Sequence, residues 1–570
     1  MCGIAGILRF DGAPAVAPDL APLRHRGPDG EAHHRSPDAS CALSLCRLAI
    51  VRPELPGRAP RDGPIVAVST GEIYDHRSRG GDGIDTDLVP ALVRRQGTGW
   101  LRTLRGPLAC AVHDENTRTL TLLRDAVGKR PLYYRQDASA LAFATEQKAL
   151  VGAEAALDPH YVAEVLGWGR SSRAAVRGVV ELLPGQGLEA RLDGSVRTWQ
   201  VDRLAPGGSR RPEEVAAILS EAIALRIPEQ VSAACAVGGM DSQLIAAGAR
   251  RPCFTLEADA AETKDAFATV AELELPHELL AQAHPEWKAL RRALWFLESV
   301  DDVACWQMAP ALLALTERVR AAGHKVLFIG EGADELFLGY PWRPRAAAPP
   351  PAPQAMLSQG AALMLDEEWR GRMEGMRLRA RHLLASDPTA LWQAETIAAL
   401  CGQDLDAAVL AAEPELTPLD ARRRAQLEEL RVEMHLLPVL HADRLAFANG
   451  VEARAPFLDR QLIDCALGLP EEALATADGP EKPVMRALYR ARFGREPRRK
   501  RGFSGVARPP AAEVEAQARA CLERGPRTVD ASGLVALLAQ PAGRPGRETL
   551  LWRVVLLEEL LDVLRFGSEP

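Results

Sequence analysis

Two short apolar segments, each running into glycines and carboxylates before a helical pattern, constrain the fold of this chain most strongly. Ala233–Val237 leads into GGMDS, and Val326–Ile329 leads into GEGADE. A third apolar segment, Pro252–Leu256, lies between them. Buried strands that alternate with helices predict a parallel sheet covered on both faces. We therefore predict an α/β domain that presents both loops at the carboxyl edge of its sheet, where such sheets bind ligands.

The first third of the chain has a different pattern, with short apolar or β-branched runs separated by turns. It predicts layered strands with few helices, of which Asp87–Gln96 is one. The composition changes at the Pro/Gly/Ser/Arg segment Leu204–Arg211, which is typical of a linker. We predict a first domain at 1–200, a linker at 201–212 and a second domain at 213–570. The strands predicted in the first domain are Pro64–Val68, Leu108–His113, Thr119–Leu123, Leu132–Tyr134 and Leu141–Ala144.

The bulk composition excludes several classes of protein. Hydrophobic residues at 47% and charged residues at 25% are typical of a globular chain, and 570 residues suggest several domains. A net charge of -7 gives no basic footprint for nucleic acid. The 10 cysteines form no CxxC pair and fit a reducing cytosol, so we expect a cytoplasmic protein. We find no signal peptide and no apolar run that could span a bilayer.

The loop VGGMDS, at Val237–Ser242, suits a bound phosphate. A strand that ends in glycines before a helix exposes backbone N–H groups, which favour anions, and glycine permits close approach. Because an aspartate there repels phosphate unless a cation intervenes, Asp241 is a candidate Mg²⁺ ligand. The alternative is a plain Gly-Gly turn in which Asp241 or Ser242 caps the helix. The loop alone leaves both interpretations open.

The second loop, within KVLFIGEGADELFLGY at Lys325–Tyr340, favours the phosphate interpretation. It repeats the order of buried strand, glycine-spaced carboxylates and helix. If the two strand ends are neighbours, Asp241 and Asp334 meet around one Mg²⁺. Glu331 then lies nearby as an acid or base.

At this point the residues resemble a known family. VGGMDS resembles the SGGxDS pyrophosphate loop of the asparagine synthetase family, and GEGADELFLGY resembles its GEGxDExFxGY segment. His441–Asp459 is similar to its DRxxMxxGxExRxPFLD segment, and Pro497–Ser504 to its late lysine-bearing loop. The resemblance covers nearly the whole chain. The segments that resemble the family's class II glutamine amidotransferase domain are Met1–Ile7, Arg24–Gly30, Arg47–Val51, Gly71–His76 and Arg124–Tyr134.

This resemblance implies a layered αββα amidotransferase domain of the Ntn type, followed by an α/β parallel-sheet PP-loop synthetase domain. Cys2, once the initiator methionine is removed, becomes the nucleophile that attacks glutamine, with its own amine as base. Arg47 clamps the glutamine α-carboxylate, while Glu72 and Asp85 receive its ammonium group. Taken singly, each of these charges is more commonly a surface ion pair.

The family's Asn-Gly-Glu is Thr70-Gly71-Glu72 in this chain. The asparagine helps to bind the oxyanion, and losing such a donor costs about 10²–10³ in rate. A threonine hydroxyl can donate a hydrogen bond but reaches less far. We therefore expect glutaminase activity that is weakened. A second departure is Val237, which replaces the serine of the family loop and predicts weaker ATP binding.

In the second domain, the resemblance implies that ATP activates a carboxylate as an acyl-AMP, which an amine then attacks. Mg²⁺ bridges Asp241 and Asp334, Glu331 accepts a proton from the amine or orients it, and Lys500 neutralises developing charge. Ammonia freed at Cys2 reaches the acyl-AMP through an internal tunnel. The implied ATP-binding positions are Val237, Gly238, Gly239, Asp241, Ser242, Leu256, Gly330 and Glu331.

Three hypotheses for the function remain open. The first is asparagine synthesis from glutamine, ATP and an acceptor acid, here aspartate. The second is an amide-forming cyclase of the same family that closes a β-lactam or the isopeptide ring of a lasso precursor peptide. Those relatives often lose the N-terminal cysteine, which is present here. The third is a weakened binding protein on the same fold. Homodimerisation stays open.

Overall fold

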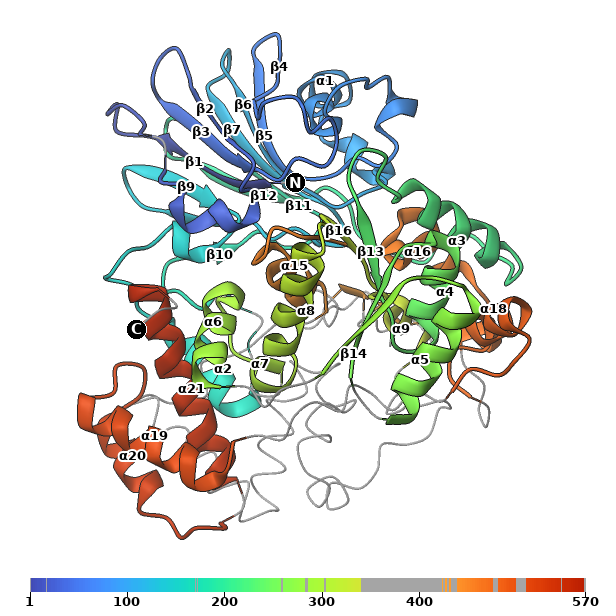
Figure 1. The fold of residues 1–570 in the computed structure, drawn as a ribbon. Helices are drawn as coiled ribbons and strands as arrows, with labels where there is room; N and C mark the ends of the chain where they lie inside the picture. The colour runs from blue at the N-terminus through green and yellow to red at the C-terminus, as the bar shows by residue number, and fades with distance from the viewer. Residues whose placement is uncertain are drawn as a thin grey trace.

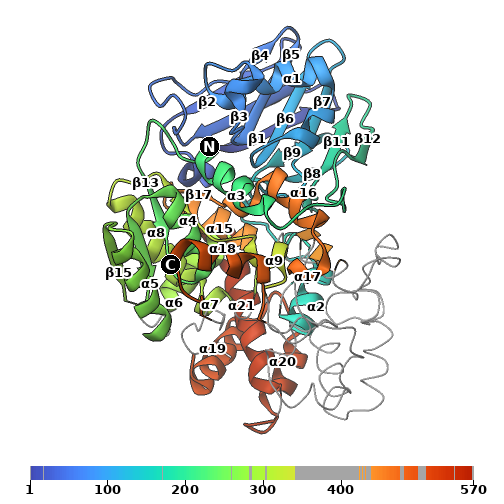
Figure 2. The same cartoon turned by 90° about the vertical axis from the view of Figure 1, so that its right-hand side faces the viewer.

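The structure is a computed structural model that describes most of residues 2–339 and 423–567. The gaps within these ranges are residues 17, 170, 172, 258–259, 282–285, 302–303, 424–425, 428–429, 432–437, 475–479, 499–508 and 545. Figures 1 and 2 show two parts, a strand-rich first part above a second part in which helices surround a smaller sheet. The proline-rich segment Arg343–Pro353 lies outside the described residues.

The first part of the chain forms two antiparallel sheets. The order in one sheet is β10-β8-β9-β1-β3-β2, and in the other β12-β11-β7-β6-β5-β4. The first sheet consists of β1 (Cys2–Arg9), β2 (Glu31–Arg35), β3 (Cys41–Arg47), β8 (Tyr133–Gln136), β9 (Ala140–Ala144) and β10 (Val180–Glu181). The second consists of β4 (Arg61–Asp62), β5 (Ile65–Gly71), β6 (Leu108–Asp114), β7 (Thr119–Arg124), β11 (Gln186–Ala190) and β12 (Val196–Gln200).

The two sheets pack face to face through side chains that alternate along each strand. In β5, Val66 and Val68 point into the core between the sheets, where they join Ile4 of β1 and Leu45 of β3. The alternate residue Ala67 lies on the other face of β5, in a core with Val89 and Leu92 of α1 (Val89–Gln96). The layered first domain is therefore confirmed. Its short helices are η1 (Ala21–Arg26), η2 (His76–Arg79), η3 (Asp85–Leu88), α1 (Val89–Gln96), η4 (Gly99–Thr103) and η5 (Gln147–Ala149).

The second part contains a five-stranded sheet in the order β15-β14-β13-β16-β17, and every pair in it is parallel. Residues of β13 alternate between two cores: Cys235 packs towards α4 and Ala234 towards α8. The predicted parallel sheet with both faces covered is confirmed. Its strands are β13 (Ala233–Ala236), β14 (Cys253–Leu256), β15 (His277–Leu280), β16 (Val326–Phe328) and β17 (Glu452–Arg454).

Helices complete the second part and form a further layer at the C-terminus. The long helix α21 (Arg547–Phe566) buries most of its residues, because its apolar side chains face α6, α19 and also α2 from the first third of the chain. The other helices described are α2 (Pro159–Trp168), α3 (Glu214–Leu225), α4 (Met240–Ala249), α5 (Ala260–Glu272), α6 (Trp287–Leu297), α7 (Ala304–Gln307), α8 (Ala309–Ala321), α9 (Ala333–Phe337), α15 (Pro438–Phe447), η10 (Pro456–Leu458), α16 (Arg460–Gly468), α17 (Glu471–Leu474), α18 (Pro483–Phe493), α19 (Ala511–Arg524) and α20 (Ala531–Leu538).

Most sequence-predicted strands agree with the structure to within two residues at each end, since each coincides with a buried apolar run. One expectation differs. Helix α4 begins at Met240 with Gly239 as its N-cap, and no side chain caps it. Asp241 therefore lies inside the first turn, and the alternative in which Asp241 or Ser242 caps this helix is wrong. Among the described residues, no helix combines the length and apolar character needed to cross a membrane.

Candidate active sites

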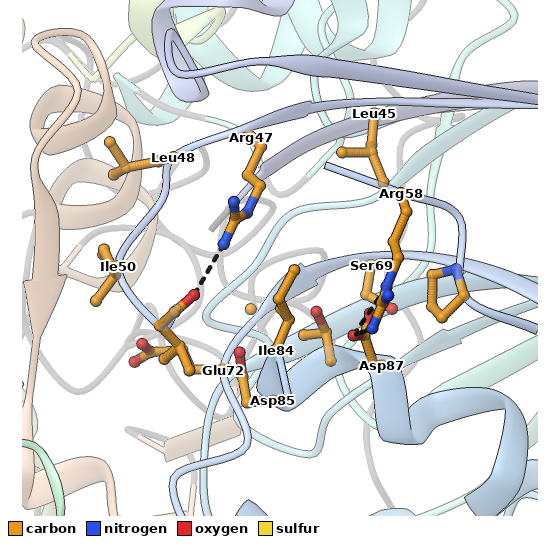
Figure 3. Close-up of a pocket in the computed structure, with 14 residues that line it drawn as sticks. Leu45, Arg47, Leu48, Ile50, Arg58, Ser69, Glu72, Ile84, Asp85 and Asp87 are labelled. Carbon is orange, nitrogen blue, oxygen red and sulfur yellow. Dashed lines mark hydrogen bonds and ion pairs between the residues drawn. The ribbon is translucent and has the colours of Figure 1, made fainter. Parts of the chain in front are cut away.

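A pocket of about 480 Å³, counting space open to solvent, lies at one end of the two-sheet sandwich. Figure 3 shows Arg47 and Glu72 at one side of it and the Arg58–Asp87 ion pair at the other. The ends of β3 and β5 and the helix η3 supply the walls. The polar residues that line it are Arg47, Arg58, Ser69, Glu72, Asp85, Thr86 and Asp87.

Arg47 is fixed in the pocket wall by backbone carbonyls. Its Nη2 donates to Val51 O at 2.8 Å and to Arg52 O at 3.0 Å, and its Nη1 donates to Leu55 O. The turn that follows β3 holds the guanidinium in this way, so the side chain is buried although no carboxylate among the described residues pairs with it. Arg47 is also the register partner of Cys2 across β1 and β3. The Cys2 side chain lies outside what the structure describes, so its role as nucleophile stays a prediction.

Two buried carboxyl groups, Glu72 and Asp85, line the same pocket. Asp85 Oδ2 accepts the backbone N–H of Ile73 at 2.7 Å. Glu72 Oε1 accepts from Nη2 of Arg454, a residue of the second part of the chain, at 2.5 Å. Burial raises the pKa of both carboxyls, and the Arg454 guanidinium opposes this shift at Glu72. The structure thus brings Arg47, Glu72 and Asp85 together.

The hydroxyl groups of Ser69 and Thr70 are both buried, and neither has a hydrogen-bond partner among the described residues. Thr70 follows Val66 and Val68 on the face of β5 that points between the sheets, since strand residues alternate. Ser69 lies on the other face and lines the pocket, whereas Thr70 does not. Both are exceptions, because buried polar groups are normally paired, and only the Ser69 hydroxyl belongs to a residue that lines the pocket.

Gly71 is required where it stands. Its φ of +138° is a conformation that L side chains rarely adopt, and a Cβ there would lie 2.1 Å from Pro107 O. The glycine lets the end of β5 lie against Pro107, so that Glu72 follows at the pocket. Close packing therefore explains why position 71 is a glycine.

The two glycine loops of the second part meet at the carboxyl edge of the sheet, because β13 and β16 are adjacent. A Cβ on Gly330 would lie 3.3 Å from the backbone N of Ser242 and 3.5 Å from Cβ of Asp241. Ser242 Oγ accepts the N–H of Gly238 and donates to Gly239 O, both at 2.9 Å. The loop is therefore closed by its own serine hydroxyl.

Val237, at the start of the first loop, is buried with no polar side chain to offer. Its N–H donates to Phe254 O at 2.9 Å, and its carbonyl accepts from Thr255 Oγ1 at 2.7 Å. Leu256 ends the neighbouring strand β14 and is half-buried. These positions build the backbone frame of the loop.

Asp241 and Asp334 converge on one lysine. Nζ of Lys482 donates to Asp241 Oδ2 at 2.5 Å and to Asp334 Oδ1 at 2.7 Å. Lys482 is almost completely buried and begins α18 with a left-handed φ of +51°. The two carboxylates thus share one cationic partner at the junction of the two loops.

The carboxylates also fit a magnesium ion. Asp241 Oδ1 is buried and accepts no hydrogen bond from any described residue, which leaves one carboxylate oxygen available. Mg²⁺ in proteins uses one or two carboxylates together with phosphate oxygens. Among the described residues, no group of three or more His, Cys, Asp or Glu side chains forms a metal site by itself. Asp241 and Asp334 are the residues that would hold the ion.

Glu331 lies in the turn between β16 and α9 and is half-buried. The next residue, Gly332, has a φ of +94°, and a Cβ there would lie 2.4 Å from Leu458 Cδ2. The turn is therefore pressed against η10, which follows β17. Lys500 lies outside the described residues, and its role stays a prediction.

Sequence reasoning missed Lys482 and Arg454. Lys482 stands 148 residues after Asp334 and outside the segments singled out above. The order Lys-Pro at the start of a helical pattern marks a helix N-terminus, but nothing in the sequence says what that lysine contacts. Arg454 lies within a segment that was singled out, yet its partner Glu72 is 382 residues away.

Comparison with known proteins finds two family matches that together span most of the chain. Residues 214–562 match the asparagine synthase family, and residues 1–199 match the glutamine amidotransferase domain. A protein of Mycobacterium tuberculosis, provisionally named asparagine synthetase (glutamine-hydrolyzing), is 28% identical over 553 residues, covering 85% of this chain and 83% of its own.

Other relatives are more distant or shorter in overlap. Asparagine synthetase (glutamine-hydrolyzing) 2 of Bacillus subtilis is 24% identical and covers 83% of this chain and 67% of its own. Amidase chyE of Penicillium rubens is 28% identical over 372 residues, covering 55% of this chain and 53% of its own. Among solved structures, a glutamine phosphoribosylpyrophosphate amidotransferase from B. subtilis is 15% identical and covers 58% of this chain and 82% of its own. Its TM-score is 0.26, so no argument is based on this likeness.

Proposed function

The chain belongs to the asparagine synthase family and is an ATP-dependent amide-forming ligase, and from this premise we propose that it makes asparagine from aspartate with ammonia taken from glutamine. The observation that carries the proposal is the convergence of Asp241 and Asp334 on Lys482 at the meeting point of the two loops. A cation between two carboxylates at the N-terminus of α4 suits the leaving diphosphate of an adenylation.

In this proposal the second site activates the acceptor acid. The backbone of Gly238 and Gly239 and the helix α4 receive the ATP phosphates, and Lys482 moves from its carboxylate partners to the released diphosphate. Mg²⁺, when bound, offsets phosphate charge beside Asp241 and Asp334. Glu331 orients the attacking ammonia or takes its proton. Lys500 neutralises charge on the reacting phosphate, as the resemblance implies.

The first site supplies the ammonia. Arg47 receives the α-carboxylate of glutamine, and the Glu72 and Asp85 carboxylates receive its ammonium group. Cys2 attacks the side-chain amide, and Thr70 supports the oxyanion. The pocket that unites Arg47, Glu72 and Asp85 supports this assignment, because one guanidinium and two carboxylates match the charges of an amino acid.

The experiment is product analysis with glutamine, aspartate, ATP and Mg²⁺. We expect asparagine, AMP and glutamate in equal amounts. Lys482→Met is expected to lower aspartate-dependent ATP–pyrophosphate exchange by about 10²-fold or more while glutamine hydrolysis persists, and Lys288→Met, at an exposed position, is the matched control. Absence of exchange with every acid in a broad panel contradicts the proposal.

The cyclase reading is kept as a second candidate because of Thr70. A chain that no longer needs efficient glutamine hydrolysis tolerates the loss of the asparagine donor at this position. AMP formed from a peptide or amino acid that carries its own amine, with loss of one water from that substrate and no need for glutamine, would favour the cyclase.

A further inference from the structure

One arginine connects the two candidate sites. Arg454 is the last residue of β17 and its side chain is almost completely buried. Its guanidinium spans the boundary between the first and second parts of the chain. Nη2 donates to Glu72 Oε1 at 2.5 Å, and Nε donates to Glu452 Oε1 at 2.9 Å. The remaining Nη1 donates to Arg226 O at 2.5 Å.

These bonds fix the guanidinium at each of its nitrogens, so the position of Glu72 follows that of β17. Arg454 also lies over the ring of Tyr74, with 5.3 Å from the guanidinium carbon to the ring centroid. An arginine that donates in a planar fork is more strongly oriented than a lysine. Glu72 Oε2 accepts no hydrogen bond from an N–H or O–H donor among the described residues, and the Glu452 carboxyl lies beside the Glu72 carboxyl.

The backbone of Arg454 reaches the other site. Its carbonyl accepts the N–H of Ile329 at 3.0 Å, and Phe328 is its register partner between β16 and β17. Ile329 directly precedes Gly330 and Glu331. One residue therefore bonds through its side chain to the carboxylate of the glutamine pocket and through its main chain to the strand end that presents Glu331.

We propose that Arg454 is a positioning residue that holds Glu72 in the orientation that receives the ammonium group of glutamine, and so makes the first site depend on the second domain. This inference rests on the proposed function. In this role Arg454 does not contact the substrate and acts through Glu72.

Loss of the guanidinium changes the Glu72 pocket in a defined way. After Arg454, the charged groups that act most strongly on Glu72 are Glu452 from β17 and Asp85 from η3, and both are carboxyls. Without Arg454, three buried carboxyls are left beside each other with less compensation, which favours the protonated form. A protonated or reoriented Glu72 binds an ammonium group weakly. The effect belongs to substrate binding, so KM changes more than kcat.

The test compares Arg454→Met and Arg454→Lys with Arg460→Met. Arg460 is a matched control, because it also crosses the boundary, contacting Asp202 and Asp464, but lines no part of the glutamine pocket. Glutamate release gives KM and kcat for glutamine, and ATP–pyrophosphate exchange reports the second site independently.

We expect Arg454→Met to raise the glutamine KM by about 10–100-fold with a change in kcat of less than about threefold. Arg454→Lys should recover part of this loss, because a lysine restores the charge without the fork. Exchange should stay within about threefold in both variants. If Arg454→Met does not fold, the size of the KM change in Arg454→Lys relative to Arg460→Met decides the question.

Three results would overturn the inference: an unchanged glutamine KM in the Arg454 variants, an equal rise in Arg460→Met, or a fall in kcat alone. Each leaves the proposed function standing, provided that the wild-type protein hydrolyses glutamine. A wild-type protein that releases no glutamate contradicts the proposed function itself and the inference with it.

Discussion

At the scale of single residues, the proposed glutamine pocket contains groups that are already paired and groups that have no partner among the described residues. Arg47 and Asp85 are fixed by backbone groups, and Glu72 is fixed by Arg454. The buried hydroxyls of Thr70 and Ser69 have no hydrogen-bond partner in the part of the chain that the structure describes. Because an unpaired buried hydroxyl costs stability, we expect the Ser69 hydroxyl, which belongs to a residue lining the pocket, to gain a partner when substrate binds.

Thr70→Val tests the hydroxyl that replaces the family's asparagine. The substitution keeps the shape and removes the donor, so we expect glutamine-dependent glutamate release to fall by about 10²-fold in kcat if Thr70 supports the oxyanion. Amide formation with added ammonium should not change. Ser69→Ala is the control on the opposite face of β5, and a larger effect there would assign the donor to Ser69 instead.

The pH dependence of glutamine binding follows from Glu72. Burial raises the pKa of Glu72. In the proposed function Glu72 receives an ammonium group as the carboxylate, so affinity should be low below that pKa and improve as pH rises through it. We expect the glutamine KM to fall as pH rises through the raised pKa of Glu72. Steady-state kinetics from acid to neutral pH check the sign, and Glu72→Gln should weaken the dependence, leaving the part due to Asp85. A KM that rises with pH contradicts this role.

At the scale of elements, the loop that presents Glu331 depends on a glycine in a left-handed conformation. Gly332→Ala adds a strained φ, which costs about 1–2 kcal/mol, and a contact with Leu458 that forces the turn away from η10. We expect ATP–pyrophosphate exchange to fall at least about tenfold, with glutamine hydrolysis preserved.

Gly323→Ala is the matched control for Gly332→Ala. Gly323 also has a positive φ, of +88°, but a Cβ there meets nothing within 4 Å. Backbone strain is therefore common to both variants, and only Gly332→Ala disturbs the loop. Equal losses of exchange in the two variants would show that strain alone is responsible, against this account.

The sequence could predict those strands whose own residues are mostly apolar. β6 and β13 are apolar runs, so their place in a core was predictable. The strand β17 (Glu452–Arg454) was not predictable, because two of its three residues, Glu452 and Arg454, are charged. The Arg454 guanidinium is buried where the Glu72 carboxylate and the main-chain carbonyl of Arg226, both distant in the sequence, accept its hydrogen bonds.

The same limit applies to the sites. The meeting of Asp241 and Asp334 was predictable, since both follow buried strands that parallel order can place side by side. Lys482 was not predictable, because its contacts span 241 and 148 residues of chain and depend on how α18 docks. Sequence patterns identify what a local segment presents, and long-range packing decides which partner it meets.

At the scale of the whole molecule, a buried lysine lies at the boundary of the two domains. Lys129 lies between the two parts of the chain, with Nζ donating to Ala453 O at 2.8 Å. Burial lowers its pKa to about 7. Between this value and the unfolded value of about 10.4, the unfolded chain binds more protons, so stability rises with pH.

Lys129→Met tests this contribution. We expect the wild-type protein to gain up to about 1.4 kcal/mol per pH unit from this group above pH 7, and the variant to lack that gain. Urea unfolding between about pH 7 and about pH 9 measures it. Lys288→Met, at an exposed position, should retain the wild-type slope. A Lys129→Met variant with the wild-type slope would contradict the assignment.

The most direct test of whether glutamine hydrolysis supplies amide formation follows the side-chain amide nitrogen of glutamine. The wild-type protein is given glutamine labelled with ¹⁵N at its side-chain amide, together with aspartate, ATP, Mg²⁺ and unlabelled ammonium in excess. We predict asparagine whose new amide carries ¹⁵N well above the label in the surrounding ammonium, with one AMP formed per amide. Formation of AMP together with a new amide that contains no nitrogen from glutamine would contradict the account.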